Sequence, residues 1–228
     1  MATYVILAGA SAGGWCFKPL TSRLRQAGHD VFTPTFTGLG ERSHLLNREI
    51  DLETHILDVL QVFKYEDLQD VILVGGSYGG MVITGVADRI PQQVRHLVYL
   101  DAAVPDDGQA MVDLVDTTVL SAVLEVIKNH GEGWYLPVDL SVNDRATPHP
   151  LKTFTQPLQL RNIQRIQAIP HTYVYCMVKS PEDAVTSLTQ ISAEKAKANG
   201  WNYFELPVSH NLIDEAPDEV TAILLALA

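Results

Sequence analysis

The chain has 228 residues, of which 46% are hydrophobic and 19% charged, and its formal net charge is -11. This balance indicates one ordered domain, and the excess of acidic residues disfavours nucleic acid and anionic membranes as partners. The first residues do not resemble a secretory signal, and no apolar run approaches the ~20 residues that span a bilayer. The two cysteines, Cys16 and Cys176, lack metal-ligand spacing and are predicted to be core thiols. We therefore expect a cytoplasmic protein.

Short apolar runs alternate with amphipathic segments along most of the chain. In chain order, strands are predicted at residues 4–8, 30–33, 71–74, 94–100, 172–178 and 203–206. Helices are predicted at residues 15–27, 52–63, 78–88, 182–198 and 216–227. Because the strands are continuous apolar runs, the pattern favours an α/β fold with a mainly parallel sheet and helices on both faces.

The alternation stops between about residues 106 and 165. A helical stretch at 111–128 leads there into an irregular, proline-rich segment. We interpret this segment as a small cap insertion within a single domain spanning residues 1–228. We predict that it forms a lid and a pocket wall, whose apolar side chains favour an ester with a hydrophobic part. For most of these side chains, however, ordinary packing of the cap on the sheet is the better explanation. They are Met111, Leu114, Val115, Leu120, Trp134, Tyr135, Leu136 and Phe154.

A serine in a glycine-rich segment lies between the third predicted strand and the helix that follows. The segment contains Gly75-x-Ser77-x-Gly79. Glycine two positions before and after a serine is typical of a sharp strand-to-helix turn, because larger side chains would collide there. Such a turn lifts the hydroxyl above the carboxyl end of the sheet. We predict that Ser77 is a nucleophile; the alternative is a turn that only permits tight packing.

Two backbone amides are candidates for an oxyanion hole, the pair of donors that stabilises negative charge on a reacting carbonyl. Tyr78 directly follows the serine at the start of a helix, and Ala10 lies in the loop after the first strand. In a turn of this kind the two donors come from these places.

One histidine occupies the position expected of a general base. His210 follows the last predicted strand and precedes the last helix, so the serine comes first and the histidine last in the chain. The others are predicted to be packing or surface histidines. They are His29, His44, His55, His96, His130, His149 and His171.

Several stretches carry a family resemblance. They are Gly9-Ala10-x-x-Gly13-Gly14-Trp15, Thr37-Gly38-Leu39-Gly40-Glu41-Arg42, Gly75-x-Ser77-Tyr78-Gly79-Gly80-Met81, Leu97-Val98-Tyr99-Leu100-Asp101-Ala102 and Ser209-His210. Together they resemble the α/β-hydrolase superfamily, and in particular small bacterial esterases related to plant methyl esterases and hydroxynitrile lyases. The resemblance implies hydrolysis of a carboxylic ester through an acyl-enzyme, with no metal or organic cofactor.

The third member of the expected triad is where the chain departs from these relatives. Most of them place an acid a few residues after the penultimate strand, where this chain has Lys179, a residue that cannot orient an imidazolium. We favour Asp101, at the end of the preceding strand, because a carboxylate there needs a partner such as a histidine N–H. Glu182 or Asp183 could serve instead, and a chain without a functional acid is the third alternative.

Other functions stay open on the same fold. The similar plant lyases carry a lysine directly after the histidine, where this chain has Asn211, which counts against a lyase. Acyl transfer needs the same residues in a drier pocket, and Lys179 at the usual acid position favours a ligand-binding protein without catalysis. We expect a small-molecule ester with a hydrophobic part as substrate, and we keep a homodimer open.

Overall fold

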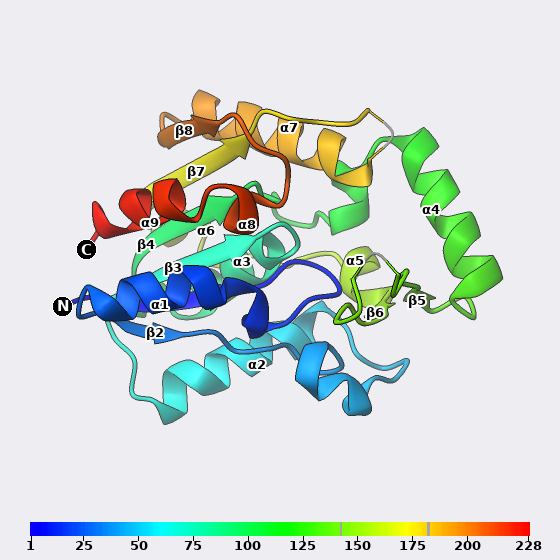
Figure 1. The fold of residues 1–228 in the computed structure, drawn as a ribbon, viewed down its shortest axis with the longest axis horizontal. Coiled ribbons are helices and arrows are strands. Elements are labelled where there is room, and N and C mark those ends of the chain that lie inside the picture. The colour runs from blue at the N-terminus through cyan, green and yellow to red at the C-terminus, as the bar shows by residue number, and fades with distance from the viewer. Residues whose placement is uncertain (142, 182) are drawn as a thin grey trace.

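The computed structural model describes residues 1–141, 143–181 and 183–228, and its centre is a sheet of six parallel strands (Figure 1). The strands lie in the order β2-β1-β3-β4-β7-β8. Their bounds are Thr3–Leu7 (β1), Asp30–Phe32 (β2), Val71–Gly76 (β3), Val94–Leu100 (β4), His171–Cys176 (β7) and Asn202–Leu206 (β8). Because the strands are parallel, their carboxyl ends lie at one edge of the sheet, and the strand order reverses direction between β1 and β3. Open α/β sheets place their sites at the carboxyl ends beside such a reversal.

Helices cover both faces of the sheet, because alternate residues of each buried strand point to opposite sides. In β1, Val5 and Leu7 belong to one apolar cluster, whereas Tyr4 and Ile6 belong to the other. The first cluster packs against α2 (Leu52–Tyr65), α3 (Gly79–Arg89) and α7 (Ala184–Ala198). The second packs against α1 (Lys18–Gln26), α8 (Leu212–Glu215) and α9 (Pro217–Leu225).

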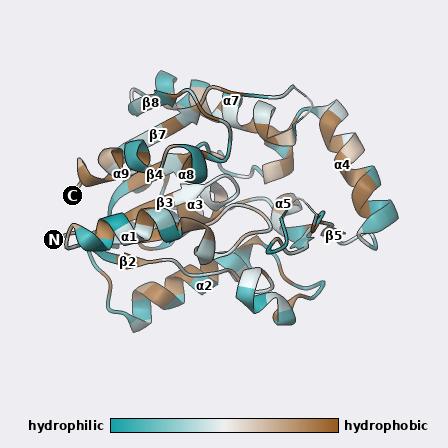
Figure 2. Cartoon of the chain, viewed as in Figure 1, coloured by the Kyte–Doolittle hydropathy of each residue, from teal (hydrophilic) through white to brown (hydrophobic). Residues whose placement is uncertain are grey.

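The segment between β4 and β7 lies outside the six-stranded sheet. The predicted helical stretch divides into a 3-10 turn, η4 (Met111–Leu114), and α4 (Thr117–His130), whose N-cap Asp116 accepts hydrogen bonds from the amides of Thr118 and Val119. Apolar and polar residues are interspersed along α4 (Figure 2), yet only Ile127 of this helix is buried. The remaining elements are β5 (Tyr135–Leu136), β6 (His149–Pro150), α5 (Lys152–Thr155) and α6 (Ile163–Ala168).

Two predicted helices begin or end differently from the pattern. The stretch at 15–27 starts with a 3-10 turn, η1 (Gly14–Phe17), before α1, and the helix predicted at 216–227 is α9, which begins at Pro217 just after the short, unpredicted helix α8. Proline fits the first turn of a helix but not its interior, so it separates the two. None of the helices in the described ranges has the length and apolar character needed to cross a bilayer.

Four histidines are buried away from the predicted base, and their burial makes the fold sensitive to acid. Burial lowers the pKa of His55 and of His171 to about 4, it lowers that of His149 well below 6.5, and it also lowers that of His96. The unfolded chain therefore binds more protons than the folded chain between about pH 6.5 and pH 4. Stability is fully present above this window and is lost as the pH falls through it, by up to about 3 kcal/mol for each of His55 and His171.

We expect the free energy of unfolding, measured with guanidinium chloride, to fall by several kcal/mol between pH 7 and pH 4.5, on the order of the linkage above. His171→Phe should remove part of this dependence, because phenylalanine does not titrate. The variant should fold, because phenylalanine can keep the stacking on Trp201, whose ring centroid lies 4.1 Å from that of His171. His130→Gln, a change at an exposed site, is the control and should leave the dependence unchanged. An equal loss of stability in His171→Phe and in the original chain would contradict the explanation.

Candidate active site

Ser77 lies on a sharp turn between β3 and α3, with a left-handed backbone φ of 51°. The turn holds this conformation through three backbone hydrogen bonds. The Ser77 amide donates to the Leu100 carbonyl (3.3 Å), and the Ser77 carbonyl accepts from the amides of Gly80 (3.1 Å) and Ala103 (3.0 Å). A non-glycine residue in this region is strained, and strain that surrounding bonds enforce is a feature of functional turns.

The glycines around Ser77 are required by close backbone approaches. A Cβ atom on Gly75 would lie 2.6 Å from the Gly79 carbonyl oxygen, and one on Gly79 would lie 2.8 Å from the Leu7 carbonyl oxygen. The loop after β1 also approaches closely, because a Cβ on Gly9 would lie 2.9 Å from the Ser77 Cβ. The Gly-x-Ser-x-Gly pattern is therefore a consequence of how tightly β1, β3 and α3 meet.

The two amides predicted to form an oxyanion hole are both free to donate. Within the described part of the chain, the backbone N–H groups of Ala10 and Tyr78 have no hydrogen-bond acceptor. Tyr78 is the N-cap residue of α3, and Ala10 lies in the loop that touches Ser77 and lines the same cavity. A helix N-terminus attracts developing negative charge, so these amides are suited to bind an oxyanion beside Ser77.

The loop that contains Ala10 is held by β6 and the residues just before it. The Ser11 amide donates to Nδ1 of His149 (3.0 Å), and the Ser11 carbonyl accepts from the Thr147 amide (3.0 Å). Because Nδ1 accepts, the proton of the buried, neutral His149 is on Nε2, which donates to Oγ1 of Thr153 (2.8 Å). Sequence reasoning treated His149 as a packing histidine and missed this contact, which joins positions 138 residues apart.

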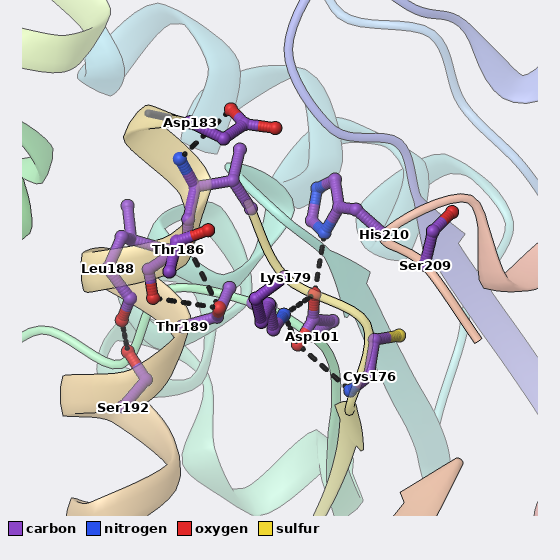
Figure 3. Close-up of polar contacts among 12 residues, drawn as sticks. Asp101, Cys176, Lys179, Asp183, Thr186, Leu188, Thr189, Ser192, Ser209 and His210 are labelled. Atoms are coloured by element: carbon purple, nitrogen blue, oxygen red, sulfur yellow. Dashed lines mark hydrogen bonds and ion pairs between the residues drawn. The ribbon is translucent and has the colours of Figure 1, made fainter. Parts of the chain in front are cut away.

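His210 forms a hydrogen bond with Asp101 (Figure 3). Its Nδ1 lies 2.7 Å from Oδ2 of Asp101, whose side chain is fully buried at the end of β4. A carboxylate can only accept, so Nδ1 carries the proton and Nε2 is left to accept one. Asp101 is itself fixed by a left-handed φ of 45° and by its amide, which donates to the Val174 carbonyl (2.7 Å).

A lysine contacts the same carboxylate. Nζ of Lys179 lies 2.7 Å from Oδ1 and 2.5 Å from Oδ2 of Asp101, and the Cys176 amide donates to Oδ1 (3.1 Å). Burial raises the pKa of Asp101, but the hydrogen bonds from His210 and Lys179 together outweigh it, so that the pKa lies below its usual value. The carboxylate is therefore ionised at neutral pH.

Asp183, the alternative acid, lies at the start of α7 and not beside His210. Its side chain accepts from the Val185 amide (3.4 Å) as the N-cap of α7 and does not bond His210 (Figure 3). Glu182, the other alternative, lies outside the described residues. Sequence reasoning treated Lys179 as a residue that cannot orient an imidazolium and missed its contact with Asp101. The available signal for this contact was its position three residues after β7, the sheet neighbour of β4.

Ser77 and His210 line one cavity of about 560 Å³. No direct hydrogen bond joins the two side chains among the described residues, as is common in structures without substrate. The apolar lining comes from Trp15, Phe17, Leu100, Val185 and Ile213, and the polar lining includes Lys18, Asn143, Arg145 and Asp214.

The predicted apolar wall from the cap is wrong for this cavity. Within the described ranges, the segment between β4 and β7 contributes Asn143, Arg145 and Ala146 to the lining. Leu114 and Phe154 are buried in the core cluster beneath the cap instead.

The prediction for the cysteines holds for Cys176, which is buried, but not for Cys16, which is only partly buried and lines the cavity.

A strained serine turn, a histidine bonded to a buried carboxylate and two free amides at the edge of a parallel sheet together define an enzyme of the hydrolase class. The chain belongs to the alpha/beta hydrolase family, whose family model matches residues 4–223. The predicted fold class and the family resemblance are thereby confirmed.

Similar proteins agree with this assignment. The chain is 37% identical to the carbendazim hydrolyzing esterase of Nocardioides sp. (strain SG-4G) over 251 aligned residues that cover 100% of both chains. It is 27% identical to methylesterase 9 of Arabidopsis thaliana, over 82% of this chain and 70% of that protein. In fold, it matches an extracellular alpha/beta-hydrolase from a Paenibacillus species with a TM-score of 0.83 at 22% identity, over 100% of this chain and 99% of the other. The prediction of an ester-hydrolysing enzyme is confirmed at the level of class.

Proposed function

We propose that the chain hydrolyses a carboxylic ester through a covalent acyl-enzyme on Ser77, with His210 as general base and Asp101 as the acid that orients it. The observation that carries the proposal is the hydrogen bond between His210 and the buried, ionised Asp101, at the cavity that also contains the strained Ser77. A strained nucleophile together with an oriented base is the arrangement of covalent catalysis, which favours an enzyme over a protein that only binds a ligand.

The mechanism follows from the proton positions. Nε2 of His210 takes the proton of the Ser77 hydroxyl as its oxygen attacks the ester carbonyl, and the amides of Ala10 and Tyr78 donate to the resulting oxyanion. The intermediate collapses, the bond to the alcohol breaks, and His210 returns the proton to the departing oxygen. Water then attacks the acyl-enzyme with the same base, which releases the carboxylic acid and restores Ser77.

The cavity and the similar proteins favour methyl esters with an apolar acyl part. Trp15 and Phe17 give the cavity an aromatic wall beside Ser77, and the Arg145 guanidinium stacks 3.9 Å from the centre of the Trp15 ring. Methylesterase 9 is a relative named for methyl ester cleavage, which supports a small alcohol as the leaving group.

A panel of methyl esters tests the proposal. We expect release of methanol from methyl benzoate and from longer apolar methyl esters, together with an equal amount of free acid. A transient acyl adduct, detected by intact mass after rapid quenching, should have the mass of the acyl group on one site. Methanol without free acid would indicate acyl transfer instead. A folded protein that turns over no ester on the panel and forms no adduct would refute hydrolysis.

A further inference from the structure

The carboxylate that orients His210 is shared with a nearly buried cation. The Lys179 side chain is 10% exposed and that of Asp101 is fully buried, and Nζ contacts both carboxylate oxygens. If a buried carboxylate were paired with a histidine alone, its full negative charge would stabilise the protonated form of the imidazole. Here an ammonium at hydrogen-bond distance offsets most of that charge.

The other titratable groups near Asp101 and Lys179 do not add negative charge beside His210 in place of the charge that Lys179 offsets. Burial raises the pKa of Cys176 to about 12 and raises those of Tyr173 and Tyr175, so all three are uncharged at neutral pH. The Tyr175 ring centre lies 4.7 Å from Nζ of Lys179. The nearby carboxylates in the described ranges have other partners or positions: Asp183 caps α7, Glu215 bonds Ser209, and Asp214 lines the cavity.

We propose that Lys179 is a positioning residue of this site: it fixes the Asp101 carboxylate and offsets its charge, so that His210 stays neutral and able to accept a proton at lower pH than an uncompensated carboxylate would allow. The inference rests on the proposed function, because it assigns His210 the role of base. Its electrostatic content, however, can be measured on His210 without any substrate.

The position of the lysine in the sheet supports a dedicated role. Lys179 follows β7, the direct neighbour of β4, whose end carries Asp101. The same carboxylate accepts from the Cys176 amide of β7, so backbone and side chain of one segment hold both of its oxygens. An exposed ion pair would contribute little, but a buried one is costly to break from either side.

The test is the titration of His210 in the intact protein, followed by NMR of its imidazole and assigned by the signal lost in His210→Gln. Lys179→Met removes the charge at similar length, and we expect the midpoint of His210 to rise by about 1 pH unit or more, as expected when a neighbouring carboxylate is no longer compensated. Lys179→Arg keeps the positive charge and should therefore keep the His210 midpoint of the original chain. The acid limb of the pH profile for ester hydrolysis should move by the same amount.

Lys195→Met is the matched control, since Lys195 also pairs with a carboxylate, Asp106 at 2.6 Å, but in the described structure the carboxylate that bonds His210 is Asp101 and not Asp106. It should leave the His210 midpoint unchanged. If Lys179→Met does not fold, Lys179→Gln takes its place, because it keeps a donor while removing the charge. An unchanged or lower midpoint in a folded, uncharged variant would overturn the inference. A raised midpoint in a protein that hydrolyses no ester would instead overturn the proposed function and leave the electrostatic role standing.

Discussion

Ser77→Ala is expected to lower ester hydrolysis by about 10⁴-fold or more and to abolish covalent labelling by a fluorophosphonate. The probe reacts with an activated serine whatever the natural substrate is, so intact mass should show one adduct on the original chain and none on the variant. Alanine keeps a side chain at the strained position, where φ is 51°, so the fold should be retained.

Ser11→Ala is a control for this experiment. Ser11 lines the same cavity and has a similar left-handed φ of 61°, but only its backbone makes hydrogen bonds in the described structure. The variant should still form the adduct. An adduct that persists in Ser77→Ala and disappears in Ser11→Ala would mean that the nucleophile has been misassigned.

Asp101→Asn should impair both catalysis and stability. Asparagine tolerates the left-handed φ of 45°, so the backbone is not disturbed. The amide cannot hold the proton of His210 on Nδ1, and we expect hydrolysis to fall by about 10³- to 10⁴-fold. The variant also leaves the ammonium of Lys179 nearly buried without its partner, which we expect to lower the free energy of unfolding by about 3–5 kcal/mol.

Two further variants separate these effects. Asp183→Asn changes only a helix cap, where asparagine serves as well as aspartate, so activity and stability should be nearly unchanged. Adding Lys179→Met to Asp101→Asn should recover part of the lost unfolding free energy, because it removes the unpaired cation, while activity should stay low. Loss of activity in Asp183→Asn rather than in Asp101→Asn would move the acid to the later loop.

The parts of the fold that depend on local sequence could be predicted. The apolar strands, the glycines around Ser77 and the chain order that selects His210 all leave a signal within a few residues. Asp101 was favoured for a physical reason, the partner that a buried carboxylate requires, and the structure places it beside His210.

What could not be predicted depends on contacts between distant segments. The pair of Lys179 with Asp101 spans 78 positions and exists only because β4 and β7 are neighbours in the sheet. The two-residue strands β5 and β6 are too short to carry a periodic pattern. The apolar residues of the cap could not be divided between cavity and core for a related reason, since hydrophobicity does not reveal which of the two a side chain faces.

The attachment of Ser11 to Thr147 and His149 makes one proposed oxyanion donor, the Ala10 amide, depend on a part of the chain that is far from it in sequence. Proteins open locally with free energies that range from near zero up to that of global unfolding. Each such opening of the segment around His149 would release the Ala10 amide while β3, α3 and Ser77 stay folded. The fraction of molecules able to bind the oxyanion would then be set by the opening equilibrium of the cap rather than by the stability of the sheet that carries Ser77, the proposed nucleophile.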